Sequence, residues 1–431
     1  MKARKITTLL CAAVMLAACE DVPENLQSRD SELNNTEQAE LTLQKGDLDT
    51  IRSCLAADAS KKYGTITVKH ASAGTAAEMP VYKVEVGGGD YTVKELAQYL
   101  YGDKYDLEDQ SKYDIRPWDF NGAEPQKNTD KYTPEIDYIP FAIYYQVDTC
   151  TPSEDDATRS VHIFSNGTCW GAQAGLYEYG NDYDAPWLGT VKAHYCPEYE
   201  DISAVSYRMY DGTEWPLADA VKFTEDFWNG ELSKNDPQKF RYKVWRAEVI
   251  DLPTNDNYGY LFMMSCEDES GNRYDCDCYD NFALMDKRVY EGKRFFIAQN
   301  QWQLSLKKDE ITRFDKAFSF KKTDTVSAGK ELLTLGGAMT VLQNELAEFI
   351  DYDFETAELC YLVTCDKYPD KDYGGVLKYS PYYCTKFCET VIRPYWCFRT
   401  TNGFIDNWNT TENYYVDAVT GEMIHIKLGA E

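Results

Sequence analysis

Histidine and cysteine side chains are the first candidates for catalysis, but their spacing gives catalysis little support. The chain has four histidines: His70, His162, His194 and His425. None lies in a metalloprotease helix motif, and no Gly-x-Ser-x-Gly elbow of a serine hydrolase is present. Cys169, next to Trp170, could act as a nucleophile with His194 as its base, but cysteines in a cysteine-rich chain more often form disulfides. We therefore predict no catalytic residue.

An acidic segment over residues 275–280 could hold a metal ion. Its sequence, Asp-Cys-Asp-Cys-Tyr-Asp, is similar to the start of a calcium loop. Such a loop needs Gly at its sixth position and Glu at its twelfth, where this chain has Asp280 and Asp286. In a strand the aspartates would share one face and the cysteines the other. We favour a solvated face opposite a disulfide-rich face, and we predict no metal site and no cofactor.

Paired carboxylates and tryptophans raise the alternative of carbohydrate chemistry. The chain has 72 acidic residues, so chance pairs are expected, and the separation that glycoside hydrolysis requires is a property of the fold. Nine tryptophans, among them Trp118, Trp187 and Trp302, could stack on sugars. Core packing is the simpler interpretation of these rings.

The N-terminus has the three zones of an export signal. Basic residues within 2–5 precede a mostly apolar run over 6–15, which is too short to span about 30 Å of hydrocarbon. Leu16-Ala17-Ala18-Cys19 follows, and it resembles the lipobox of bacterial lipoproteins. The resemblance implies cleavage before Cys19, lipidation of its thiol and a location on the extracytoplasmic face of the cell membrane. No later apolar run is long enough to span a membrane, so this lipid is the only anchor that we expect.

Cysteine count and charge fit an exported chain. Besides Cys11 and Cys19, twelve cysteines remain, and this even number favours at least two disulfides of unknown pairing. Cys360 and Cys365 are separated by four residues, and Cys384 and Cys388 by three, whereas zinc ribbons usually have two. The net charge is −28, and loss of the three basic residues of the signal leaves −31. Such a charge is repelled by nucleic acid, so we expect no nucleic-acid partner.

Composition and periodicity divide the chain into five segments. Residues 1–18 are the predicted signal peptide, and the acidic residues 19–45 a disordered tether. We predict a mixed N-terminal α+β domain over 46–205, a middle helix-plus-sheet domain over 206–329 and a C-terminal domain over 330–431. The predicted fold class is α+β, with antiparallel sheets each packed with a helix.

Hydrophobic periodicity places the elements within these segments. Helical spacing predicts three helices, over residues 91–101, 216–230 and 334–350. Alternation predicts strands over residues 65–68, 81–86, 141–147, 160–164, 206–210, 240–250, 259–266, 294–298, 302–306, 357–365, 382–399 and 414–427. The second and third helices are offset by 118 residues, and each is followed by strands. This offset raises the hypothesis of a duplicated helix-plus-sheet unit.

The C-terminal sequence also suggests a family. Residues 391–398 read Val-Ile-Arg-Pro-Tyr-Trp-Cys-Phe, and residues 417–422 read Asp-Ala-Val-Thr-Gly-Glu. Asp417 can accept hydrogen bonds from the following backbone, and Gly421 can adopt a positive φ. The pattern resembles the end of PepSY-type and YycI-type extracytoplasmic domains. Over about the last 100 residues, the resemblance implies a helix on an antiparallel sheet and a non-catalytic inhibitory, sensory or chaperone-like module.

Two features depart from that family pattern, namely the many cysteines and the long N-terminal half. The chain also resembles lipoproteins of clostridia, which implies no particular activity. The sequence thus favours a lipid-anchored extracytoplasmic binding or regulatory protein that acts on protein or envelope partners. A carbohydrate- or solute-binding lipoprotein is the first alternative, and an envelope hydrolase is the second.

Overall fold

The structure is a computed structural model, and residues 44–431 form one compact unit within it. It describes residues 43–56, 61–86, 96, 99–100, 146–150, 160–164, 169–172, 190–234, 238–252, 257–274, 295–296, 301–316, 320–346, 350–365, 390–400 and 412–427. The predicted signal peptide and nearly all of the predicted tether lie outside these residues, as does most of the predicted helix over 91–101. In the part of the chain that is described, no helix is both long and apolar enough to cross a membrane.

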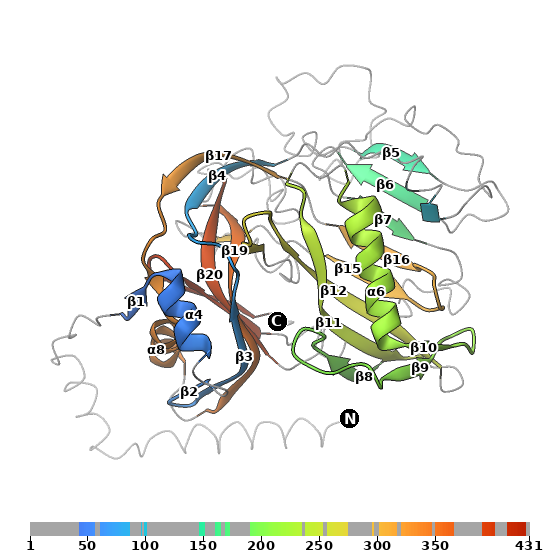
Figure 1. The fold of residues 1–431 in the computed structure, drawn as a ribbon, viewed down its shortest axis with the longest axis horizontal. Helices are drawn as coiled ribbons and strands as arrows, with labels where there is room; N and C mark the ends of the chain where they lie inside the picture. The colour runs from blue at the N-terminus through green and yellow to red at the C-terminus, as the bar shows by residue number, and fades with distance from the viewer. Residues whose placement is uncertain are drawn as a thin grey trace, which may run out of the picture. The chain divides into compact units, whose positions relative to one another are not determined.

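One sheet is built around the long strand β19, and we call it the β19 sheet (Figure 1). Its central strands pair in the order β2, β3, β19, β20, β21 and β22, and β17 and β4 join it through β20. The strands are β2 (Lys61–Tyr63), β3 (Ile66–Ala73), β4 (Val81–Val86), β17 (Phe320–Ser327), β19 (Tyr352–Cys365), β20 (Thr390–Thr400), β21 (Glu412–Asp417) and β22 (Met423–Lys427).

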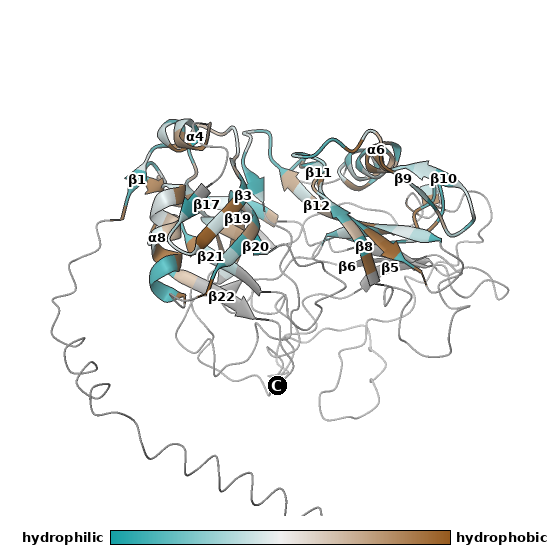
Figure 2. Cartoon of the chain, turned by 90° about the horizontal axis from the view of Figure 1, so that it is seen from below, coloured by the Kyte–Doolittle hydropathy of each residue, from teal (hydrophilic) through white to brown (hydrophobic). Residues whose placement is uncertain are grey.

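Two helices pack against the β19 sheet. They are α4 (Leu48–Ala56), which packs against β3, and α8 (Leu335–Glu345), which contacts β2 and β21 (Figure 2). Helix α8 begins after Thr334, whose hydroxyl accepts the backbone N–H of Gly337 at 3.1 Å. The short strand before it, β18 (Leu332–Leu333), pairs with β1 (Lys45–Gly46). The indole of Trp396 donates to the Leu333 carbonyl at 2.8 Å, which ties the sheet to the start of α8.

The second sheet is built around β12, and we call it the β12 sheet. Its strands pair in the order β8, β11, β12, β15, β16, β7, β6 and β5. They are β5 (Gln146–Cys150), β6 (Ser160–Phe164), β7 (Cys169–Ala172), β8 (Thr190–Tyr195), β11 (Arg241–Asp251), β12 (Tyr258–Glu267), β15 (Trp302–Ser305) and β16 (Arg313–Lys316).

Helix α6 (Leu217–Phe227) covers one face of the β12 sheet and ends in a π-helical turn, η6 (Trp228–Leu232) (Figure 2). It follows a hairpin of β9 (Ser206–Arg208) and β10 (Glu214–Pro216). The ring of Phe227 stacks edge-on against Phe314, and the Trp228 indole donates to Gln303 at 3.0 Å. The opposite face carries an apolar cluster: Trp245, Ile250, Leu252, Leu261, Met263, Trp302, Leu304 and Leu306. Because side chains alternate along β12 and β15, each strand supplies both faces.

A short strand, β13 (Arg273–Tyr274), joins the two sheets. It pairs with both β12 and β19, and β14 (Phe295–Phe296) pairs with β19. Strand β3 lies parallel to β19, so segments almost 300 residues apart share a sheet. Strands from both sides of the boundaries predicted near residues 205 and 329 therefore pair with each other. Those boundaries remain a prediction about which parts of the chain fold together.

The structure confirms the α+β class, with two largely antiparallel sheets that each pack with helix. The predicted turn in the last hairpin is also confirmed. Asp417 accepts the backbone N–H groups of Val419 at 2.8 Å and Thr420 at 3.0 Å, and Gly421 has φ +80°. Only glycine adopts that backbone region without a steric penalty. In one detail the prediction was wrong, because Pro216 ends β10 as the N-cap residue of α6 and is not inside the first helical turn.

Candidate functional site

An ion-pair network occupies the region where the two sheets meet, and we call it the interlayer network. Arg399 of β20 lies over the Trp245 ring of β11, with 4.7 Å between the guanidinium carbon and the ring centre. The members of the network are Lys69, His70, Glu198, Glu200, Lys243, Glu267, Arg273, Glu355, Glu358 and Arg399. They come from several strands of both sheets and from the segment that follows β8.

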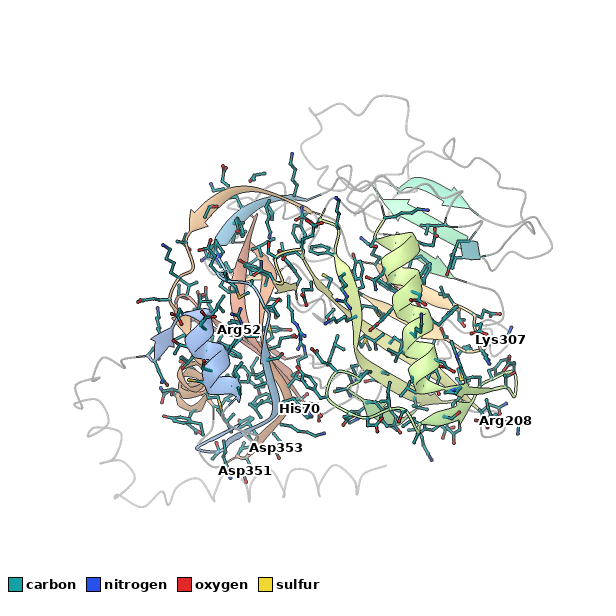
Figure 3. All side chains as sticks on the ribbon, in the orientation of Figure 1. Arg52, His70, Arg208, Lys307, Asp351 and Asp353 are labelled. Atoms are coloured by element: carbon teal, nitrogen blue, oxygen red, sulfur yellow. The ribbon has the colours of Figure 1, made fainter. Side chains whose placement is uncertain are left out.

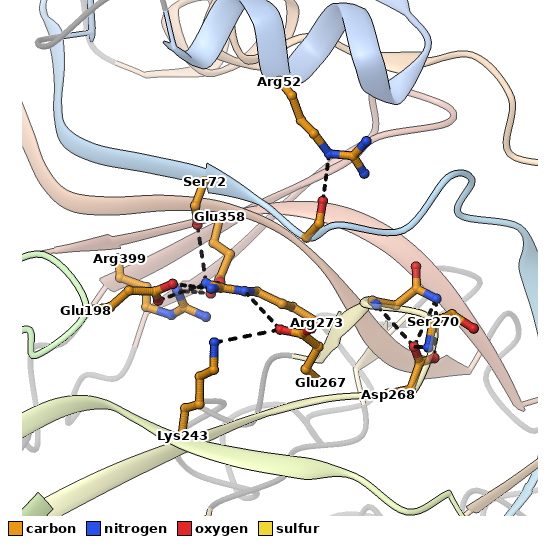
Figure 4. A network of polar contacts seen from close by, with 12 residues as sticks. Arg52, Ser72, Glu198, Lys243, Glu267, Asp268, Ser270, Arg273, Glu358 and Arg399 are labelled. Carbon is orange, nitrogen blue, oxygen red and sulfur yellow. Dashed lines mark hydrogen bonds and ion pairs between the residues drawn. The ribbon is translucent and has the colours of Figure 1, made fainter.

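Glu358 is the buried centre of the network (Figure 4). One carboxylate oxygen accepts from Arg273, and the other accepts from Arg399 at 3.0 Å. Burial raises the pKa of Glu358, but the charges of Arg273 and Arg399 outweigh it and hold the pKa below its ordinary value. Glu358 is therefore ionised at neutral pH and acts as a fixed charge between two cations.

Arg273 extends the network to the surface (Figure 4). Besides Glu358 it pairs with Glu198, and it lies 3.5 Å from the Ser72 hydroxyl and 4.0 Å from Glu267. Burial lowers the pKa of Arg273, but the two glutamates Glu358 and Glu198 raise it well above its ordinary value. One guanidinium thus joins β13, β3, β19 and the segment after β8. Arginine suits this position because its planar guanidinium group has five N–H donors for several partners.

Glu355 is the second carboxylate centre. Its Oε1 lies 2.7 Å from the Lys69 ammonium and 3.8 Å from Nε2 of His70. Lys69 also lies 3.6 Å from Glu200, and the His70 ring, which projects from β3 in Figure 3, stacks on Tyr199 at 4.6 Å. The Glu355 side chain is 2% exposed, whereas that of Lys69 is 53% exposed, so this part of the network reaches solvent.

Two strand irregularities place residues of this region. The pairing of β19 with β20 shifts between Phe354 and Thr356, which leaves Glu355 as the extra residue. The pairing of β11 with β12 shifts between Val244 and Arg246, which leaves Trp245 as the extra residue. Such β-bulges redirect side chains locally. Simple alternation could not have indicated where Glu355 and Trp245 point.

Cys196 and His194 lie near the same charges, and Cys196 lacks the protonation state of a nucleophile. Burial, reinforced by the charge of Glu355, raises the pKa of the Cys196 thiol to about 12. The thiolate, which is the reactive form, is therefore scarce at neutral pH. Burial and the charge of Arg246 lower the pKa of His194, so its imidazole is neutral. These two groups are suited to holding structure.

A separate cluster at the edge of the β19 sheet surrounds the ammonium group of Lys322. The Lys322 ammonium lies 2.9 Å from a carboxylate oxygen of Asp268 and 4.7, 5.5 and 5.7 Å from the ring centres of Tyr82, Tyr274 and Tyr361. Burial raises the pKa of Asp268, but the bonds from Lys322 and Tyr274 bring it below its ordinary value. The arrangement combines an ion pair with cation–π contacts, and it ties β17 to the turn between β12 and β13.

The structure does not bring together the cysteine–histidine pair considered from the sequence. Cys169 is on β7 and His194 is on β8, and four strands of the β12 sheet separate these two. At about 4.8 Å between neighbouring strands, the separation is roughly 24 Å. His162 and His425 lie in strands β6 and β22, as predicted.

The candidate metal segments fall largely outside the described residues. Residues 275–280, Cys384 and Cys388 lie outside them, and so do Cys19, Trp118 and Trp187. Within the described part of the chain, no three His, Cys, Asp or Glu side chains are grouped so that they could hold a metal ion. Trp302 is 8% exposed and belongs to the apolar cluster of the β12 sheet, so its ring offers no open surface to a sugar.

Sequence reasoning missed the interlayer network. Its residues are far apart in the chain, and each charge taken alone is typical of a solvated strand face. One available signal was the position of two charged residues next to long apolar runs, Glu358 in β19 and Arg399 in β20. Buried charges require partners, so these two could have been expected to pair.

Comparison with known proteins gives no match. No protein-family model matches the chain, no curated protein matches its sequence, and no solved structure matches it. The resemblances to bacterial lipoproteins and to PepSY-type and YycI-type domains therefore stay predictions from the residues that suggested them.

Proposed function

We propose that this chain is a lipid-anchored extracytoplasmic protein that binds or regulates a protein or envelope partner. The observation that carries the preference for binding over catalysis is the state of the interlayer network. Glu358 is fixed between two arginines, and the Cys196 thiol has a pKa of about 12. Catalytic acids, bases and nucleophiles require pKa values near the working pH, and these groups are held away from it.

The location in this proposal rests on the N-terminal sequence. Leu16-Ala17-Ala18-Cys19 supplies the predicted cleavage and lipidation site. Two or three acyl chains at Cys19 would anchor the protein firmly, because each buried CH₂ contributes about 0.8 kcal/mol. The acidic residues 19–45 would then separate the folded unit from the bilayer.

The order of elements supports tandem PepSY-like units as the finer form of this proposal. Along the chain, β10 is followed by α6 and the antiparallel pair β11 and β12 of the β12 sheet. In the same way, β18 is followed by α8 and the antiparallel pair β19 and β20 of the β19 sheet. The first strand of each pair carries a β-bulge, at Trp245 in β11 and at Glu355 in β19. Duplication of one unit would produce the same order of elements and a β-bulge in the same strand of each copy.

The accessible rim of the network is the surface through which we propose that a partner binds. Lys69, Glu198 and Glu200 are 53%, 32% and 31% exposed in their side chains. Lys69 contacts the buried Glu355, Glu198 contacts Arg273, and Glu200 pairs with Lys69. A partner that presents complementary charges could pair with these residues without disturbing Glu358. Rim charges mainly affect association rate and specificity, which suits a regulatory contact.

Capture of partners from the native envelope tests this proposal. We expect the full chain, cross-linked in place, to enrich one protein or envelope component, and we expect Glu198→Lys together with Glu200→Lys to reduce that enrichment at least fivefold. Asp351→Lys together with Asp353→Lys is the matched control, since both are exposed acidic residues (Figure 3) that are not among the members of the network. Binding on a glycan array without a protein partner would favour the carbohydrate-binding alternative and would overturn the proposal.

A further inference from the structure

Two cysteine side chains meet inside the β19 sheet, on the face that carries Glu358. The sulfur atoms of Cys360 on β19 and Cys397 on β20 are 3.0 Å apart, and both residues are fully buried. In the antiparallel register Cys360 is opposite Tyr395, and Cys397 is opposite Glu358. The two cysteines are therefore diagonal neighbours on one face of a two-strand ladder.

This contact differs from that of an ordinary buried cysteine. An isolated buried thiol behaves as a small apolar side chain, and the buried thiol of Cys266, for comparison, accepts from the Gln301 amide at 4.0 Å. At Cys360 and Cys397 the two sulfurs need to approach by only about 1 Å to reach the 2.05 Å length of a disulfide bond. A diagonal position requires the strands to adjust slightly, which makes such a bond easier to reduce than an unstrained one.

We propose that Cys360 and Cys397 form a reversible cross-strand disulfide. Each thiol loses its hydrogen, and a sulfur–sulfur bond forms between the two strands. The oxidant is a disulfide of low molecular weight or of a thiol–disulfide oxidoreductase, which accepts two electrons and two protons and becomes two thiols. Thiolate attack through a mixed disulfide provides the route. Because both sulfurs are buried, the exchange takes place before β19 and β20 close, or during their local opening.

The position of the bond gives it a consequence for the interlayer network. Cys397 is directly opposite Glu358, and Arg399, two residues further along β20, pairs with the same carboxylate. A bond between the strands would fix their register next to this ion pair. It would also close a loop between residues separated by 37 positions, and such loops stabilise mainly by restricting the unfolded chain. The redox state of this pair would thus set the rigidity of the network.

The oxidising surroundings that favour such a bond come from the proposed extracytoplasmic location, but the chemistry can be tested without it. The full chain is purified, reduced, unfolded and refolded with glutathione disulfide. Remaining thiols are then alkylated in denaturant, and the digest is mapped by mass spectrometry. We expect a linked pair of peptides containing Cys360 and Cys397, lighter by two hydrogens than the sum of the reduced peptides.

Two cysteine variants test whether the proposed disulfide stabilises the fold. We expect reduction to lower the Tm of the wild-type chain by about 5 °C more than that of Cys360→Ser or Cys397→Ser. Cys266→Ser, which removes a buried sulfur elsewhere, should keep the wild-type response. Complete alkylation of both cysteines after oxidation, or linkage of either to a different cysteine, would overturn the inference. Failure of the proposed membrane anchor would appear in the mass of the N-terminus and would leave this result unchanged.

Discussion

Replacing Glu358 with Gln is expected to lower the free energy of unfolding of the full chain by about 3–5 kcal/mol. The substitution keeps the size of the side chain but removes the negative charge between Arg273 and Arg399. Arg399 is 3% exposed and Arg273 12% exposed in their side chains, so both would lose the counter-charge of Glu358, although Glu198 would still pair with Arg273. Urea unfolding followed by tryptophan fluorescence measures the change.

Glu198 offers the matched control because it binds the same guanidinium of Arg273 from the surface. Its side chain is 32% exposed, so Glu198→Gln should cost no more than about 1 kcal/mol. Equal losses for the two variants would mean that burial of Glu358 does not decide the strength of the pair, and the account of the network would be wrong.

The carboxylate of Glu358 also makes the free energy of unfolding depend on pH. The pKa of Glu358 in the folded chain is below its ordinary value of 4.5, so the stability from its charge is present above that pH. This stability is lost as the pH falls through the lower folded-state pKa. The difference in unfolding free energy between wild type and Glu358→Gln should therefore be constant from pH 6 to 8 and should shrink under more acidic conditions.

Truncation of Trp228 or Trp396 to Ala is the second large expected effect, with a loss of about 3–5 kcal/mol for each. Both side chains are fully buried, Trp228 in the π-helical turn η6 that follows α6 and Trp396 next to the start of α8. Trp228→Ala also removes the donor to Gln303, which is fully buried. Calorimetry and urea unfolding would give both the size of each loss and the number of transitions.

The number of transitions decides how the two sheets are coupled. Because β13 pairs with both sheets and the interlayer network joins them, we expect one transition that moves with either substitution. Two transitions, with Trp228→Ala affecting only one and Trp396→Ala only the other, would contradict this coupling. That outcome would instead support separate folding domains with boundaries near residues 205 and 329.

Local sequence patterns predicted the elements well where one physical signal was strong. The apolar repeat in 334–350 predicted α8, which ends at Glu345, and alternation predicted β11 and β12 to within two residues. Asp417 predicted its turn because its side-chain bonds are made with the next few residues. Signals of this kind are local, so no tertiary information is needed to interpret them.

Long-range pairing could not be predicted in the same way. Nothing in residues 66–73 indicates that they lie parallel to residues 352–359. The interlayer network depends on that pairing, since it places Ser72 beside Glu358 and His70 beside Thr356. The bulge at Glu355 breaks the alternation from which its direction would be inferred. The candidate site therefore depends on topology, for which a single sequence carries only weak signals.

The anchored, extracytoplasmic location is the central claim, and the mass of the N-terminal peptide of the native protein tests it most directly. We predict that this peptide begins at Cys19 and carries a diacylglyceryl group on the thiol. Cys19→Ala should remove the lipid mass and release the protein from the membrane fraction. A native protein that retains Met1, or that has an unmodified thiol at position 19, would contradict the account.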